Sequence, residues 1–280
     1  MAAMIDRTSP PPILSAKHPA APSVFRPENL LREARRQKNL PATAVPEICL
    51  LDPDGDLETE LHRAGRAVPD PDWPCYHTTL SRFSLGPEQF GLIPRAVGAP
   101  FAVLEAEQLF AAGCRLLLSV TSAGQIADLG PPPYFILIDR ALRDEGTSYH
   151  YLPPSPFAAA DPALADAVQA ALRRLPFPVH RGASWTTDAP FRETEAAIAA
   201  AAAAGALAVE MEAAALYAFA RAAGRDVLCF AHVTNQMART TGDFEKGEAN
   251  GTTDLLHLLA ATAEAWRGHA RKARHATEPG

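Results

Sequence analysis

Apolar runs and amphipathic segments alternate along the chain from about residue 45. Seven runs have the length and composition of buried strands, namely 46–52, 88–97, 114–124, 134–142, 179–188, 206–211 and 227–236. Six segments have helical periodicity or strong helix formers, namely 56–65, 98–113, 161–175, 193–205, 212–224 and 252–274. Apolar strands that alternate with helices are typical of a largely parallel sheet covered on both faces. The pattern therefore predicts an α/β fold, a single-domain three-layer sandwich with a central mixed, largely parallel sheet.

The two ends of the chain lack this alternation. Six prolines stand in the first 27 residues, together with scattered alanine and serine. Because such a segment has few apolar side chains to bury, residues 1–40 are expected to form a Pro/Ala-rich N-terminal arm that is partly disordered. Residues 41–272 are expected to form the α/β domain, and residues 273–280 a C-terminal tail.

Charge and hydropathy exclude several classes of partner. The 280-residue chain carries a net charge of −6, so neither nucleic acid nor an anionic membrane surface is expected as a partner. No apolar run approaches the length of about 18 residues that a membrane span needs. The sequence before the first strand also lacks the apolar core of a secretory signal. The protein is therefore expected to be cytoplasmic.

The four cysteines are far apart and never in Cys-x-x-Cys spacing. Cys114 and Cys229 lie in apolar runs, so we expect them to be buried thiols rather than disulfide partners or metal ligands. The histidines also lack the spacing of metal ligands, and the sequence predicts no metal site.

Polar residues and glycines follow the predicted strands. They form the segments 52–56, 98–100, 121–125, 143–148, 186–192, 210–213 and 232–236. Since ligands of α/β sheets bind outside the carboxyl ends of the strands, this edge is where an active site is expected. Here Glu210 and Glu212 flank Met211 in an otherwise apolar run. Two carboxylates in a segment that enters the core indicate a functional site. The alternative is that they only stabilise the amino end of a helix electrostatically.

Four motifs occur together in the order and spacing of one known family. They are VGAP (97–100), SVTSAG (119–124), RDEGTSYHYLPP (143–154) and VEMEAAALY (209–217). Together they resemble the nucleoside phosphorylase superfamily, over about residues 46–265, and are most similar to its uridine-phosphorylase-like members. The resemblance implies that family's fold and an enzyme that cleaves the N-glycosidic bond of a nucleoside.

The resemblance also implies roles for the Glu-Met-Glu motif. In the family the second glutamate holds the ribose hydroxyls and the methionine packs beneath the sugar, which makes Glu212 catalytic and Met211 substrate-binding. A carboxylate can accept hydrogen bonds from two vicinal hydroxyls and favours a cationic sugar in the transition state. Glu210 is a further substrate-binding candidate. The alternative is that it only stabilises the amino end of the following helix.

Asn235 and Gln236 align with the Asn-Arg pair that uridine phosphorylases carry after the last strand. An amide offers the base both a donor and an acceptor, and the lack of a carboxylate here favours a pyrimidine-like base over a purine. Asn235 is the second catalytic candidate and Gln236 a substrate-binding one, unless Asn235 is only a turn residue. Phe191 follows Pro190, which stands at the family's base-stacking position, so Phe191 either stacks on the base or belongs to the core.

The chain departs from the family at the phosphate site. Gly55 and Ser119 stand where phosphate-using members carry arginines, and neither residue can replace the bidentate contacts of a guanidinium. The remaining candidates for holding phosphate are Gly98, Arg95 and Ser122. The loop 121–124 is instead similar to that of hydrolytic nucleosidases, which makes Ser122 and Gly124 substrate-binding candidates as well.

Asp52, Asp54 and Asp56 follow the first predicted strand at the same edge. Three carboxylates would repel phosphate, and one of them could activate water as a general base. The alternative is a solvated turn in which Asp56 caps the next helix. Phosphorolysis and hydrolysis therefore both stay open.

The expected function is phosphorolysis of a uridine-like nucleoside to its base and ribose 1-phosphate. Inorganic phosphate would be the co-substrate, and no other cofactor is expected. The alternatives are a phosphate-independent nucleosidase and a non-catalytic nucleoside-binding protein. Members of the family are usually dimers or rings of dimers, so a homodimer or a higher homo-oligomer is expected.

Overall fold

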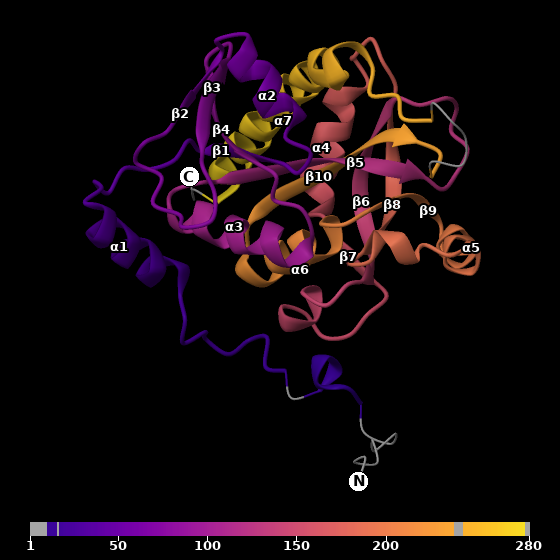
Figure 1. The fold of residues 1–280 in the computed structure, drawn as a ribbon, viewed down its shortest axis with the longest axis horizontal. Coiled ribbons are helices and arrows are strands. Elements are labelled where there is room, and N and C mark those ends of the chain that lie inside the picture. Colours follow the sequence, from indigo (N-terminus) through magenta and orange to yellow (C-terminus); the bar gives the residue numbers. More distant parts are fainter. Residues whose placement is uncertain (1–9, 16, 238–242, 278–280) are drawn as a thin grey trace.

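A mixed sheet of ten strands runs through the centre of the molecule in the computed structural model, which describes residues 10–15, 17–237 and 243–277 (Figure 1). The strands are β1 (Ile48–Asp52), β2 (Ala67–Pro69), β3 (Ser81–Leu85), β4 (Glu88–Pro94), β5 (Leu116–Gln125), β6 (Tyr134–Asp144), β7 (Phe157–Ala159), β8 (Val179–Thr187), β9 (Ala206–Glu210) and β10 (Asp226–Asn235).

The strand order brings the carboxyl ends of several strands together. The order is β10-β6-β8-β9-β5-β1-β4-β3-β2, and β10 also pairs with β5, which closes one half of the sheet on itself. β1 lies parallel to β4 and β5, and β10 lies parallel to β5. Gly124 of β5 is paired with Asn235 of β10 on one side and with Val209 of β9 on the other. The strand ends that carry these motif residues therefore meet at one edge of the sheet.

Helices cover the sheet on both faces, which confirms the α/β fold with three layers. The helices are α1 (Pro27–Lys38), α2 (Asp56–Arg63), α3 (Ala99–Ala111), α4 (Pro162–Leu172), α5 (Glu195–Ala203), α6 (Ala213–Ala223) and α7 (Thr252–Thr277). α3 packs against α6, and α4 against α7 (Figure 1). Of the helices in the described ranges, none combines the length and the apolar character that crossing a bilayer requires.

The ends of the chain contain more helix than expected. Within the predicted arm, α1 begins with a proline at its first position, and Leu31 and Ala34 are buried on its inner face. α1 packs against α3, so this part of the arm contributes to the core. At the other end α7 continues to Thr277, into the predicted tail. Residues 1–9, 16 and 278–280 lie outside the described residues.

The apolar strands pack as the hydropathy pattern predicts. β1 is buried at all five positions, and β10 at all but its first. The predicted buried thiols are confirmed, because all four cysteines are free and buried. The short strands β2, β3 and β7 were not predicted. Their residues alternate only weakly between apolar and polar positions, so the sequence pattern does not reveal them. They form strands because they pair with neighbouring strands.

Candidate active site

Glu210 organises the turn between β9 and α6. One of its carboxylate oxygens accepts the N–H groups of Glu212 and Ala213, each at 2.7 Å. The other oxygen accepts the hydroxyls of Ser184, at 2.9 Å, and Thr186, at 2.5 Å. Glu210 is buried and thus caps the start of α6 from inside the core. Its hydrogen-bonding capacity is used by the protein itself, which places it as a positioning residue and not as a group free to bind a ligand.

Glu212 points inward from the same turn and is only 1% exposed. Its carboxylate accepts the N–H of Gly98 at 2.7 Å and the N–H of Met211 at 3.3 Å. Burial raises the pKa of the Glu212 carboxyl to about 8, and repulsion from Glu210 adds to the rise, whereas the hydrogen bonds, including one from Thr121, oppose it. Burial and the neighbouring Glu210 therefore favour the protonated form of Glu212 when no ligand is bound.

The end of β10 meets the end of β5 at a close approach. Asn235 is buried, and its Oδ1 accepts the N–H of Met237 at 2.9 Å. A Cβ added at Gly124 would collide with Sδ of Met237 and lie 3.1 Å from Cγ1 of Val209. A larger residue at position 124 would require the side chain of Met237 to move, so glycine suits this close approach. Met211, on the turn between β9 and α6, is half-buried. Met237, which the sequence analysis did not select, lies over Gly124.

Two of the expected substrate-binding side chains lie outside this cluster. Phe191 is 98% exposed on the short 3-10 turn Pro190–Arg192, so it belongs neither to the core nor to the group around Glu212. Gln236 is also exposed, and its backbone N–H donates to the carboxylate of Asp243.

The turn after β1 holds a buried carboxylate. Oδ1 of Asp52 accepts the N–H of Gly55 at 3.2 Å, and Oδ2 accepts the N–H of Glu58 at 3.0 Å. Burial raises the pKa of Asp52 to about 6, and repulsion from Asp54 and Asp56 contributes to this rise. Such a value suits a group that exchanges protons near neutral pH.

Lys246 lies against the same turn and was missed by the sequence analysis. Its Nζ is 3.3 Å from Oδ2 of Asp54 and 2.5 Å from Oδ2 of Asp56. The expectation that Asp56 caps the next helix was wrong, because Gly55 occupies the N-cap of α2 and Asp56 pairs with Lys246 instead. Asp54 also accepts the hydroxyl of Ser122.

The three candidates for holding phosphate are each engaged within the protein. The N–H of Gly98 donates to Glu212, and the hydroxyl of Ser122 donates to Asp54. The side chain of Arg95 is 60% exposed and lies 3.4 Å from the carboxylate of Glu58. Arg95 also has a φ of 62°, a conformation that non-glycine residues adopt rarely.

A cavity of about 20 Å³ lies between this acidic turn, β5 and the start of α7. Asp52, Thr121, Ser122 and His232 are among its lining residues. The volume corresponds to about one water molecule. His232 stacks on Phe135, and burial lowers the pKa of the imidazole to about 4, so this histidine is neutral at neutral pH.

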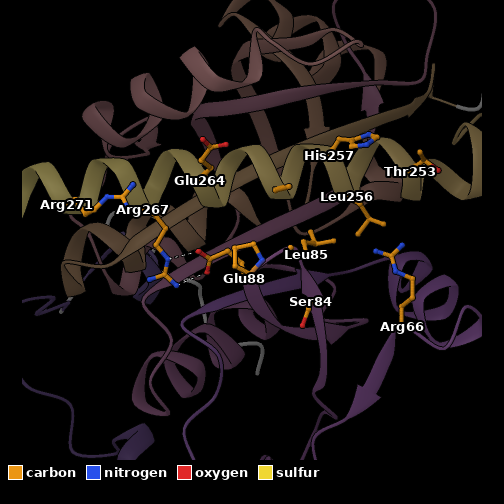
Figure 2. Close-up of a pocket in the computed structure, with 13 residues that line it drawn as sticks. Arg66, Ser84, Leu85, Glu88, Thr253, Leu256, His257, Glu264, Arg267 and Arg271 are labelled. Atoms are coloured by element: carbon orange, nitrogen blue, oxygen red, sulfur yellow. Dashed lines mark hydrogen bonds and ion pairs between the residues drawn. The ribbon is translucent and has the colours of Figure 1, made fainter.

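The larger cavities lie elsewhere. One of about 790 Å³ separates α7 from the turn between β3 and β4, where Arg267 pairs with Glu88 (Figure 2). Another, of about 880 Å³, lies beside the amino-terminal end of β10. Glu212 and Asn235 line neither of them. Cys75, His77 and Glu105, which the sequence analysis did not select, also lie together, with Glu105 in α3.

Comparisons with known proteins identify the family. The chain resembles a crystal structure of uridine phosphorylase from Vibrio fischeri ES114, complexed with 6-hydroxy-1-naphthoic acid, with a TM-score of 0.65 and 18% sequence identity. That match covers 81% of this chain and 91% of the other and shows the fold. No curated protein matches the chain. A sequence model of the phosphorylase superfamily matches residues 47–264, which is most of the chain. The chain therefore belongs to the phosphorylase superfamily.

Proposed function

We propose that the protein cleaves the N-glycosidic bond of a nucleoside. The observation that carries this proposal is the buried carboxyl of Glu212, fixed where β5, β9 and the start of α3 converge, in a chain that belongs to the phosphorylase superfamily. In such a position a carboxyl can recognise a sugar by hydrogen bonds that water does not weaken.

Glu212 binds the ribose hydroxyls, and Met211 packs against the sugar. As the bond to the base breaks, positive charge grows on the sugar carbon. A cation within a few ångströms lowers the pKa of a carboxyl. The pKa of about 8 would then fall, and the proton of Glu212 would pass to water and from there to the departed base anion. The resulting charge on the carboxylate would stabilise the transition state more than the ground state.

Asn235 binds the base, which we propose to be uridine-like. Its Oδ1 accepts the N–H of Met237, and one hydrogen of its NH₂ is donated to Oγ1 of Thr234 at 3.2 Å, so the second N–H is the group it can offer to a base carbonyl. Neither Asn235 nor Gln236 can protonate a purine ring, which supports a pyrimidine that leaves without ring protonation.

Attack by water is the reaction that the acidic turn favours. Asp52, Asp54 and Asp56 would repel phosphate, and Lys246, a cation at this turn, is already paired with two of them. The adjacent cavity of about 20 Å³ has the size of one water molecule. Asp52, whose pKa of about 6 lies near neutrality, is the general base that takes the proton from that water.

Phosphorolysis is the second candidate, and two observations favour it. The chain is similar in fold to a uridine phosphorylase. Lys246 could supply one cationic contact to phosphate if its pairs with Asp54 and Asp56 opened. That reaction would yield ribose 1-phosphate in place of free ribose.

One assay separates these reactions. The protein is incubated with a panel of pyrimidine and purine nucleosides, with and without inorganic phosphate, and the free base and the sugar product are quantified by chromatography. Release of base without phosphate supports hydrolysis, and release that requires phosphate supports phosphorolysis. Nucleoside binding without turnover under either condition would support a non-catalytic binding protein and overturn the proposal.

A substitution sharpens the choice. Lys246→Met removes a cation that pairs with Asp54, the residue that accepts the hydroxyl of Ser122. If phosphate binds there, the KM for phosphate should rise by at least about tenfold, as expected for a lost charge-assisted contact. If water is the nucleophile, phosphate should affect neither the wild type nor this variant.

A further inference from the structure

A thiol, an imidazole and a carboxylate meet beside α3. Cys75 and His77 lie on the loop between β2 and β3, and Glu105 lies in the middle of α3. The ligand atoms of these three residues all fall within 4.8 Å of one another. Glu105 stands seven residues beyond Gly98, which is about 10 Å along the helix from the end that holds Glu212. The group is therefore separate from the candidate active site.

Glu105 is a buried carboxylate without a cationic partner among the described residues. It is 0% exposed. It accepts the hydroxyl of Thr78 at 2.9 Å, and the thiol of Cys75 lies 3.4 and 3.5 Å from its two oxygens. A hydroxyl and a weak thiol donor offset little of the cost of removing a carboxylate from water. Buried carboxylates are usually paired with a cation or bound to a metal ion.

The loop holds Cys75 and His77 in place for a shared ligand. Nζ of Lys38 donates to the carbonyls of Pro74 and Cys75, at 2.9 and 2.6 Å, which fixes the backbone of the loop. The thiol of Cys75 is buried, and its sulfur accepts the N–H of His77 at 3.3 Å. The ring of His77 is exposed, so it can turn toward the other two ligands without disturbing the core.

We propose that Cys75, His77 and Glu105 bind a divalent zinc-type cation. Sulfur, imidazole nitrogen and carboxylate oxygen are the three ligand types of zinc, and the thiolate disfavours magnesium and calcium. On binding, the proton of the Cys75 thiol passes to solvent and the sulfur–metal bond replaces it. Glu105 thereby gains its counter-charge, and a water molecule completes the tetrahedron. With bonds of about 2.0–2.3 Å, the three ligand atoms draw closer together, mainly by movement of His77.

The metal ion would tie the loop 70–80 to α3. Binding to the folded state alone raises the free energy of unfolding, so the metal-loaded protein should melt at a higher temperature than the metal-free protein. This proposal does not depend on the proposed reaction at Glu212.

The test uses the full-length protein after removal of metals by chelator dialysis. Titration with Co²⁺ should give a near-ultraviolet thiolate-to-cobalt charge-transfer band that saturates at one ion per chain and disappears when Zn²⁺ is added. Cys75→Ser should abolish the band. His77→Ala and Glu105→Gln should each weaken cobalt binding by at least about tenfold, in the range found for groups that tune metal sites.

Cys49→Ser is the matched control. The Cys49 thiol is also buried but bonds to the carbonyl of Pro46 at 3.3 Å, a contact that serine can keep, so this variant should retain the band. A wild-type protein without the band, or a band unchanged in Cys75→Ser, overturns the proposal. If Cys75→Ser does not fold, His77→Ala decides, because its side chain is exposed. Cobalt affinity unchanged in that variant would equally overturn the assignment.

Discussion

Two glutamates separated by a single residue have different environments at the start of α6. Glu210 uses both oxygens to accept four hydrogen bonds, from two backbone N–H groups and two hydroxyls. Glu212 accepts from the backbone of Gly98 and Met211. Burial raises the pKa of both carboxyls. The first glutamate shapes the turn, and the second is the one that we propose binds the sugar.

Substituting Glu212 tests its role in turnover. Glu212→Gln keeps the size of the side chain but cannot become negative, so kcat should fall by at least about tenfold if that charge stabilises a cationic sugar. Steady-state release of base from the best nucleoside substrate measures the effect. Glu195→Gln, on the exposed face of α5, is the control and should retain full activity. An unchanged kcat in Glu212→Gln would remove this residue from the mechanism.

The raised pKa of Glu212 also predicts how stability depends on pH. The carboxyl titrates at about 8 when folded, against the ordinary value of 4.5. Between these values the folded state holds a proton that the unfolded state has lost, so the free energy of unfolding should fall as pH rises through this range. Glu212→Gln lacks this proton, and its stability should fall less steeply. Urea denaturation at pH 5 and pH 8 compares the two slopes; equal slopes would contradict the assignment.

The proposed general base makes a kinetic prediction. Asp52 accepts a proton only when ionised, so kcat/KM should decline as pH falls below about 6. Asp52→Asn should lower the rate by about 10²-fold and remove this acidic limb, because an amide does not titrate. A pH–rate profile of both proteins provides the measurement. A variant with the same limb as the wild type would show that another group is the base.

At the scale of elements, the hydropathy pattern predicted most of what positions the site. The long apolar runs became β5, β6, β8, β9 and β10 because burial on both faces leaves few alternatives for such segments. β5 and β10 are parallel neighbours, so their carboxyl ends must meet. For this reason the sequence alone could place Gly124 and Asn235 at the same edge of the sheet, although they lie far apart along the chain.

Contacts made by irregular segments could not be predicted in this way. Lys246 follows the last strand in a loop without periodicity, and nothing in the sequence relates it to aspartates about 190 positions earlier. Phe191 was selected because it follows the family's stacking position, but its turn directs the ring to solvent. Glu105 lies on an ordinary apolar helix, and only the path of the loop 70–80 reveals its neighbours.

The helix α1 shows how proline content can mislead. Residues 1–40 were assigned to an arm, yet α1 buries Leu31, which is 1% exposed. Leu31→Ala should lower the free energy of unfolding by about 2–5 kcal/mol, the usual range for a buried leucine. Arg32→Ala, on the exposed side of the same helix, should change it by less than about 0.5 kcal/mol. Denaturant titration distinguishes the two. Equal effects would mean that α1 is not part of the folded domain.

At the scale of the whole molecule, three of the exposed large apolar side chains lie on or beside α3. Leu104 lies on the outer side of α3, Val97 lies just before this helix, and Tyr76 belongs to the loop that packs on it. Scattered exposed apolar residues are common on monomers, but a group of them on one face is typical of an interface. We propose that this face joins two copies of the chain.

This homodimer gives the last prediction. Leu104→Arg puts a charge into the face and should shift the protein from dimer to monomer, because an unpaired charge is costly to bury between two subunits. Sedimentation velocity over a range of concentrations measures the change. Val68→Arg, at an exposed position on the edge strand β2, is the control and should leave the dimer intact. A wild-type protein that stays monomeric would exclude the dimer. A dimer that survives Leu104→Arg but not Val68→Arg would place the contact between subunits elsewhere. Leu104 belongs to α3, and Gly98 at the amino end of this helix donates its N–H to Glu212. If turnover is lost together with the dimer, the neighbouring copy therefore contributes to the site around Glu212.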